Sequence, residues 1–225
     1  QQVLAVADNA DSAGNFPVIS DNLLSDCLPS PYTAIKVYYG IAPHTTVASA
    51  RAAIQSEFIA GKLLVNFVGH AYRAAWANED LLMTTDVPLL VNEGRHPVVL
   101  AMTCREGQFQ EPGPYTTESP GEEALGEVVT RAQGRGAVAS WSPTGLGVAS
   151  GHDHLNRGFY DALFTSGTGI VGQAVAAGKL RLFLANTSPD LLDTYMLFGD
   201  SATRMPLVPT DVSIHGLTAT ADGHD

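Results

Sequence analysis

The sequence is poor in basic residues and in cysteine. Of its 225 residues only 12 are Lys or Arg, against 23 Asp or Glu, which gives a formal net charge of −11 at pH 7. This balance argues against a nucleic-acid partner, because phosphate backbones are bound by clusters of basic side chains. The two cysteines, Cys27 and Cys104, are too few for a disulfide framework. A cysteine outside such a framework is instead a candidate nucleophile.

Long hydrophobic runs are also missing. No uninterrupted apolar stretch reaches the roughly 18 residues of a membrane-spanning helix, so no membrane span is expected. The chain opens with QQVLAVAD, which has no basic segment ahead of its apolar residues and so lacks a signal-peptide pattern. We interpret this opening as that of a processed piece of a longer protein. With 45% hydrophobic and 16% charged residues, the chain can bury a sizeable core.

Short apolar runs alternate with segments of helical periodicity. The expected strands are Val3–Ala7, Ala34–Tyr39, Leu63–Phe67, Val98–Met102 and Ala137–Ser140. The expected helices are Val18–Leu28, Thr45–Ala60, Thr84–Val91, Gly121–Gln133, Asp153–Phe164 and Gly169–Ala185. Such alternation is typical of βαβ units, and it predicts an α/β fold with a mainly parallel sheet that is covered by helices on both faces.

Three of the expected strands end in a chemically functional side chain. Asp8 follows the first, His70 follows the run LLVNFVG, and Cys104 follows VVLAMT. Ligands of parallel α/β sheets bind beyond the carboxyl ends of the strands, so these side chains are expected to share one crevice. An imidazole can take the proton of a thiol, and a carboxylate can orient the imidazole. The sequence therefore predicts Cys104 as nucleophile, His70 as general base and acid, and Asp8 as the orienting group.

Backbone and neighbouring groups complete the predicted site. The N–H groups of Ala71 and Cys104 are candidate oxyanion donors, because each directly adjoins a reactive side chain. Trp76, Arg105 and Gly145 lie in loops near the strand ends, and we expect them to line a substrate cleft. The alternative for Trp76 is a packed side chain beneath a surface loop, and the alternative for Arg105 is a pair with Glu106.

Several segments resemble the gingipain family of cysteine peptidases, in the caspase-like clan. They are VNFVGHAYRAAW, VLAMTCREGQF, EALGE, GAVASW and LLDTYMLFGDSATRMPLVPTDV. The resemblance implies a three-layer caspase-like fold and a His–Cys dyad, which falls on His70 and Cys104. It also implies an acidic residue that supports the histidine, for which Asp8 is the nearest match and Asp11 a poorer one.

The sequence departs from the family pattern in three places. Ala71 replaces the glycine expected after the catalytic histidine, and Ser201 replaces a proline in the FGDP element. The acid that selects arginine substrates has no clear counterpart, because that region reads GNFPV. Peptide cleavage is therefore better supported than specificity for Arg or Lys.

The resemblance also implies properties of the whole protein. Residues 1–205 correspond to the peptidase domain, and residues 206–225 are expected to be a linker and the start of a further β-domain. Polypeptide substrates, covalently linked neighbouring domains and an extracellular or cell-surface location are implied. Catalysis would need no cofactor, whereas a structural calcium ion is common in the family and has no position here. A metal site at His152 and His154 is not expected, since residues two apart point to different faces of a helix.

Two other functions remain open from the sequence. The chain would serve as an inactive caspase-like binding or scaffold module if Ala71 and the missing specificity acid mean that catalysis has been lost. It would be a self-processing module if its only substrate were the longer chain of which it is part.

Overall fold

The computed structural model describes residues 1–110 and 123–208 of the chain. Its centre is a six-stranded sheet of order β2-β1-β3-β7-β8-β9. The strands are β1 (Gln2–Ala7), β2 (Thr33–Tyr38), β3 (Leu64–Val68), β7 (Val98–Met102), β8 (Ala139–Pro143) and β9 (Tyr195–Gly199). All neighbouring pairs are parallel except β8 and β9, which are antiparallel. The predicted α/β fold with a mostly parallel sheet is confirmed.

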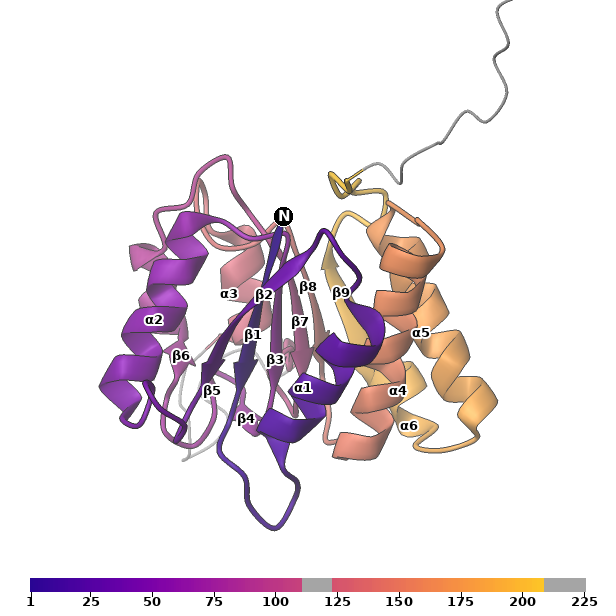
Figure 1. Ribbon diagram of the computed structural model, residues 1–225, viewed down its shortest axis with the longest axis horizontal. Helices are drawn as coiled ribbons and strands as arrows, with labels where there is room; N and C mark the ends of the chain where they lie inside the picture. Colours follow the sequence, from indigo (N-terminus) through magenta and orange to yellow (C-terminus); the bar gives the residue numbers. More distant parts are fainter. Residues whose placement is uncertain (111–122, 209–225) are drawn as a thin grey trace, which may run out of the picture.

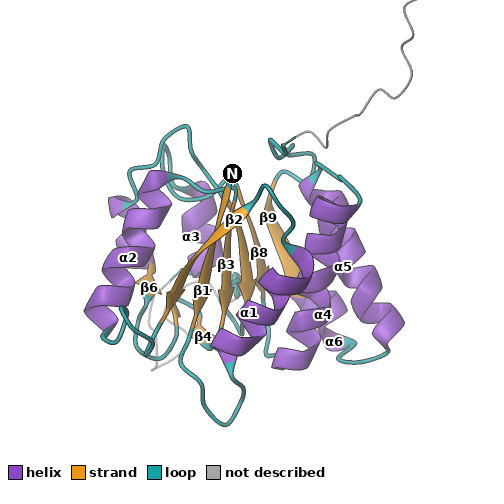
Figure 2. Ribbon diagram, viewed as in Figure 1, coloured by secondary structure: helices purple, strands orange, loops and turns teal. Residues whose placement is uncertain are grey.

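Helices cover both faces of this sheet (Figure 1). One face carries α2 (Val47–Ala60) and α3 (Leu125–Arg131), and the other carries α1 (Phe16–Cys27), α4 (Ala149–Tyr160), α5 (Val171–Ala185) and α6 (Asp190–Thr194). The colouring by secondary structure in Figure 2 shows the resulting three layers, helix, sheet and helix. A π-helical turn, Asp161–Thr165, extends α4.

The alternation of side chains along the strands divides the core in two. Val3, Ala5 and Ala7 of β1 pack with α1, α4 and α5 in one cluster, while Leu4 and Val6 pack with α2 and α3 in the other. Successive residues of a strand point to opposite faces of the sheet, so each strand supplies both cores. All five residues of β3 and of β7 are buried, as expected for central strands of a sheet that is covered on both sides.

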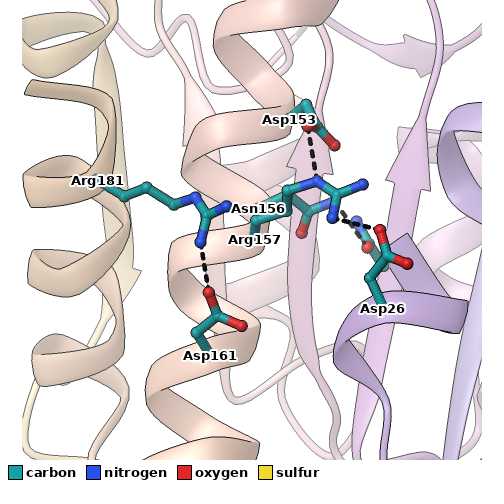
Figure 3. Close-up of polar contacts among 7 residues, drawn as sticks. Asp26, Asp153, Asn156, Arg157, Asp161 and Arg181 are labelled. Atoms are coloured by element: carbon teal, nitrogen blue, oxygen red, sulfur yellow. Dashed lines mark hydrogen bonds and ion pairs between the residues drawn. The ribbon is translucent and has the colours of Figure 1, made fainter. Parts of the chain in front are cut away.

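Polar contacts link the helices of the α1, α4 and α5 layer (Figure 3). Arg157 of α4 bonds to Asp153 one turn earlier and reaches Asp26 of α1, and Arg181 of α5 pairs with Asp161. Half-exposed ion pairs of this kind contribute at most about 1 kcal/mol each. The layer is therefore held mainly by its apolar contacts, and the ion pairs add polar links from α4 and its π-helical extension to α1 and α5.

A small antiparallel sheet follows β3 and was not predicted. It consists of β4 (Ala71–Tyr72), β5 (Ala75–Trp76) and β6 (Leu82–Met83), and it leads into the 3₁₀ helix Thr84–Leu89. Strands of two residues carry too little hydrophobic pattern to be recognised in a sequence. They matter here because β4 begins directly after His70.

Most element bounds agree with the sequence to within a few residues, and the strand Val98–Met102 agrees fully. One helix was placed wrongly, because α4 begins at Ala149 and not at Asp153. Asp153 is paired with Arg157 inside the helix and does not cap it. The first residues of the predicted helix at 121–133 and nearly all of the predicted β-domain start at 206–225 lie outside the described residues.

Candidate active site

The strands β1, β3 and β7 are neighbours in the sheet, and their carboxyl ends lie at the same edge (at the bottom in Figure 1). Backbone hydrogen bonds continue past the strands themselves, from Asp8 N–H to the Val68 carbonyl at 3.1 Å and from Gly69 N–H to the Met102 carbonyl at 3.3 Å. The sheet thus sets the positions of the residues that follow each strand. It brings Asp8, His70 and Cys104 to one edge, as the sequence predicted.

Gly69 allows the first two of these strand ends to approach closely. A Cβ atom at Gly69 would lie 2.4 Å from the Cβ of Asp8 and 2.9 Å from the ring of Phe67. Both distances are far below van der Waals contact, and the first involves an atom fixed to the backbone. A glycine is therefore required before His70 for steric reasons.

The carboxylate at the His70 ring belongs to Asp11 and not to Asp8. Oδ2 of Asp11 lies 2.8 Å from Nε2 of His70. Asp8 instead accepts the backbone N–H of His70 at 3.2 Å and that of Asn9 at 2.8 Å. The prediction that Asp8 orients the imidazole is therefore wrong. A side chain placed directly at the end of β1 reaches the backbone that follows β3, and it does not reach the His70 ring. The loop after β1 is needed to carry a carboxylate to the ring.

The loop that holds Asp11 is itself ordered by that residue. The other carboxylate oxygen of Asp11 accepts the N–H of Ala13 at 2.8 Å. The Ala13 N–H, followed by His70, holds the pKa of the Asp11 carboxyl below its usual value. Burial has the opposite effect on Asp8 and raises the pKa of its carboxyl, although the two backbone N–H bonds oppose the change. Asp11 is thus the better anionic partner for an imidazolium ion.

The imidazole of His70 is held from two sides. Asp11 binds Nε2, and the ring of Phe16, the first residue of α1, packs edge-on against it with centroids 5.2 Å apart. If Nε2 carries the proton that Asp11 accepts, Nδ1 is left with a lone pair. Nδ1 is then the ring nitrogen that can take a proton from a nucleophile.

Cys104 lies with His70 in the wall of one cavity of about 190 Å³. Its Sγ atom makes two contacts with the backbone of Gly147, at 3.5 Å to the carbonyl and 3.4 Å to the N–H. Within residues 1–110 and 123–208 no hydrogen bond joins Cys104 to His70. Such bonds are often long in a ligand-free site and tighten when substrate binds.

Within the described part of the chain, the two predicted oxyanion donors, the N–H groups of Ala71 and Cys104, donate no hydrogen bond to another residue. Ala77 donates its N–H to the carbonyl of His70 at 2.7 Å, so Ala71 and Trp76 form the next, non-hydrogen-bonded pair of the β4–β5 ladder. The N–H of Ala71 therefore points away from β5. The N–H of Cys104 likewise donates to no described residue, although those of Thr103 and Arg105 on either side are bonded.

The loop that carries Cys104 is braced by segments far along the chain. Arg105 adopts a left-handed φ of 58° and donates its N–H to the carbonyl of Gly145 at 2.9 Å. Tyr195, the first residue of β9, donates its hydroxyl proton to the carbonyl of Ala101 at 3.1 Å and accepts the N–H of Thr103 at 3.3 Å. Gly145 thus supports the loop of the nucleophile, and the adjoining Gly147 lines the cavity. The Arg105 side chain bonds to Gln108 at 2.7 Å.

Trp76 does not line the cleft, and that prediction is wrong. Its side chain is 1% exposed and stacks on Phe67 with ring centroids 4.6 Å apart. Its indole N–H donates to the carboxylate of Glu106 at 3.3 Å. Glu106 is fully buried just after the nucleophile, and this burial raises the pKa of its carboxyl to about 7. The sequence indicated an exposed loop position for Trp76, but its side chain is instead buried by packing against aromatic residues on the α2 face of the sheet.

His152 is the site residue that the sequence reading missed. It lies on α4, is 5% exposed and lines the cavity that His70 and Cys104 share. Burial lowers the pKa of its imidazole to about 4. Had the helix been predicted to start at Ala149, His152 would have fallen next to the buried stripe of that helix, which is formed by Gly151, Leu155 and Phe159. The sequence would then have indicated a buried histidine. Starting the helix at Asp153 left this histidine outside it.

In the ranges 1–110 and 123–208 no group of three or more His, Cys, Asp or Glu side chains is arranged to hold a metal ion. The structural calcium ion stays a prediction without a position. None of the helices there is long and apolar enough to cross a membrane.

These features define an α/β protein with a histidine and a cysteine at the ends of adjacent parallel strands, the arrangement of caspase-like cysteine peptidases. The chain belongs to peptidase family C25, the gingipain family, whose family model matches residues 1–206. Comparison with curated protein sequences gives no match.

Solved structures of gingipains share the fold. The Arg-specific cysteine proteinase gingipain R has 23% sequence identity and a TM-score of 0.70, with 91% of this chain and 47% of that chain covered. The complex of the pro- and mature domains of RgpB from Porphyromonas gingivalis gives 22% identity and the same TM-score, with 91% and 48% covered. The present chain therefore spans about half the length of these relatives.

Proposed function

We propose that the chain is a cysteine endopeptidase in which Cys104 is the nucleophile and His70 the general base and acid. The observation that carries the proposal is the shared cavity of these two side chains, with Asp11 bound to the far nitrogen of the His70 ring. Membership of peptidase family C25 supports the same chemistry. Polypeptides are the substrates, and no cofactor takes part in the reaction.

The proposed reaction follows from the positions of these groups. Nδ1 of His70 takes the proton of Cys104, and the resulting thiolate attacks the carbonyl carbon of a peptide bond. The N–H groups of Ala71 and Cys104 stabilise the oxyanion that forms. The C–N bond then breaks, the amine leaves with the proton held by His70, and a thioester remains. Water, deprotonated by His70, cleaves the thioester, and the proton returns to the sulfur.

The replacement of glycine by Ala71 is compatible with this role. A Cβ atom does not remove a backbone N–H group, and the β4–β5 register directs this N–H away from the neighbouring strand. Asp11 acts as a positioning residue, because it contacts the imidazole and not the reacting atoms. The proposal includes an extracellular or cell-surface location and covalently linked neighbouring domains, both of which the family resemblance implies.

Selective alkylation of the two cysteines tests the proposal. Cys27 is buried, and burial raises the pKa of its thiol to about 11, so at neutral pH only about one molecule in ten thousand carries its thiolate. Iodoacetamide at pH 7 is expected to label Cys104, to spare Cys27 and to abolish peptide cleavage. Cys104→Ala is expected to be inactive, and Cys27→Ala is the matched control that keeps full activity.

Two outcomes would contradict the proposal. Peptide cleavage that persists in Cys104→Ala would show that another group is the nucleophile. A folded wild-type chain that cleaves no peptide and whose Cys104 reacts no faster than a free thiol would favour the binding-module alternative. Mass spectrometry of a longer version of the chain would separate general from self-directed cleavage, because only a self-processing module would cut its own sequence and nothing else.

A further inference from the structure

The cavity beside Cys104 is small and enclosed on several sides. Its volume of about 190 Å³ is below the roughly 300–1,000 Å³ of sites that enclose drug-sized ligands, so it suits a single side chain. It lies between the start of α1 and the start of α4, at the edge of the sheet. Its apolar wall is formed by Ala13, Phe16, Val68, Met102, Val148 and Ala149.

The position of this cavity determines which substrate residue it would receive. In the thioester intermediate the acyl carbon is bonded to Sγ of Cys104, and the side chain of the acyl residue leaves from the next carbon atom. Because Cys104 and the residue pair Gly69–His70 are part of the cavity wall, that side chain is the one within reach. The cavity therefore corresponds to the residue on the acyl side of the scissile bond.

The charge of the lining is the decisive property. Among the described residues that line it, none is Asp, Glu, Lys or Arg, and the titratable groups are Cys104, His70 and His152. The two carboxylates of the adjoining loop are already engaged, Asp11 with His70 and Ala13 and Asp8 with the backbone N–H groups of His70 and Asn9. A guanidinium or ammonium group that entered would lose its hydration without gaining an ion pair, which is strongly unfavourable.

His152 keeps the inner wall neutral. It is buried, and within the described residues its Nε2 atom has no hydrogen-bond partner. This atom lies against Gly147, where a Cβ atom would come within 2.3 Å of it. With a pKa of about 4 the ring is uncharged at neutral pH. Because the Nε2 atom is itself buried, this part of the wall presents an uncharged ring to an incoming side chain.

We propose that this cavity is the specificity pocket of the peptidase and that it takes an uncharged, predominantly apolar side chain on the acyl side of the scissile bond. This inference rests on the proposed function, because it assigns the substrate of the same site. It predicts that the enzyme discriminates against Arg and Lys at that position.

A peptide library in which only the acyl-side residue varies tests the proposal. The wild-type chain is expected to cleave peptides with Leu, Met or Ala at that position at least tenfold more efficiently, in kcat/KM, than those with Arg or Lys. The variant Ala149→Asp places a carboxylate in the cavity wall at the first residue of α4, where a negative charge suits the helix dipole. It is expected to raise kcat/KM for Arg relative to Leu by at least tenfold.

Ser150→Asp is the matched control. It adds the same charge one residue later, at an exposed position outside the cavity wall, and should leave the Arg-to-Leu ratio within about twofold of wild type. Ala13→Asp, in the exposed loop before α1, provides a second carboxylate in the wall if Ala149→Asp does not fold. A wild-type preference for Arg, Lys, Asp or Glu would overturn the proposal, as would acidic wall variants with unchanged preference.

Failure of the proposed function would give a different result. If the wild-type chain cleaves none of the peptides, binding of uncleaved library peptides to Cys104→Ala is measured by calorimetry. Tighter binding of peptides with an uncharged residue than of Arg peptides, reversed by adding Ala149→Asp, would support the pocket while the peptidase function fails. Equal or absent binding would overturn the pocket as well.

Discussion

Nε2 of His70 lies 2.8 Å from Oδ2 of Asp11, whereas Asp8 bonds to the backbone N–H of the same histidine. The two carboxylates of one loop thus have separate tasks, one at the imidazole and one at the main chain. Asp11→Asn should lower kcat roughly ten- to a hundredfold, because a misoriented imidazole loses part of the 10²–10⁴ gain of general acid–base catalysis. Its unfolding temperature should stay near that of wild type.

Asp8→Asn is the counterpart of that variant and should show the reverse pattern. An amide can replace only one of the two N–H acceptors that Asp8 supplies, which costs about 1–3 kcal/mol of unfolding free energy. Denaturant unfolding and steady-state kinetics on both variants provide the measurement. A greater loss of kcat in Asp8→Asn than in Asp11→Asn, at equal stability, would restore Asp8 as the orienting residue.

Gly69→Ala should destabilise the protein by about 3 kcal/mol, because its Cβ would overlap the Cβ of Asp8 and the backbone on both sides is fixed in the sheet. Gly94→Ala is the comparison. Gly94 has a φ of 76° but no atom within 4 Å of the added Cβ, so only backbone strain of about 1 kcal/mol is expected. Urea unfolding measures both, and equal effects would refute the steric account of Gly69.

Glu106 should make the protein less stable as the pH rises. Its pKa is about 7 in the folded chain and about 4.5 in the unfolded one, so the folded state binds more protons between these values and the unfolding free energy falls with pH. Glu106→Gln removes this group. Relative to wild type, the variant should gain about 3 kcal/mol between pH 4.5 and pH 7.5, from roughly 1.4 kcal/mol per pKa unit.

The difference between the two proteins is the quantity to measure, because His152 acts in the opposite direction. The pKa of His152 is lowered to about 4. Its contribution to the unfolding free energy is therefore complete above its ordinary pKa and is lost as the pH falls toward 4. Subtracting the wild-type unfolding free energy from that of Glu106→Gln at each pH cancels the contribution of His152. A difference that does not change with pH would show that Glu106 titrates normally.

Trp76→Phe should lower the unfolding free energy by about 1–2 kcal/mol and leave KM within about twofold of wild type. The variant loses the indole hydrogen bond to Glu106 and part of the contact with Phe67. Chemical denaturation and peptide-cleavage kinetics separate the two effects. A large rise in KM with unchanged stability would return Trp76 to the substrate cleft.

The sequence was sufficient to predict which strand ends carry the chemistry, but not which side chains meet. His70 and Cys104 directly follow long apolar strands, and neighbouring parallel strands place such residues predictably. Asp11 could not be chosen over Asp8, because the path of the loop after β1 depends on the Asp11–Gly14 turn and on the packing of α1. Trp76 was misplaced because short strands leave no periodic signal, and His152 because a helix start was placed four residues late.

The bracing of the Cys104 loop has a consequence for the synthesis of the protein. Its supports, Gly145, Gly147 and Tyr195, all come from sequence well beyond the cysteine itself. A ribosome that has just completed residue 104 has therefore made the thiol but none of these supports. The proposed enzyme would acquire its cutting activity only when β9 has been translated and added to the sheet, so that incomplete chains are poorly equipped to digest themselves or one another.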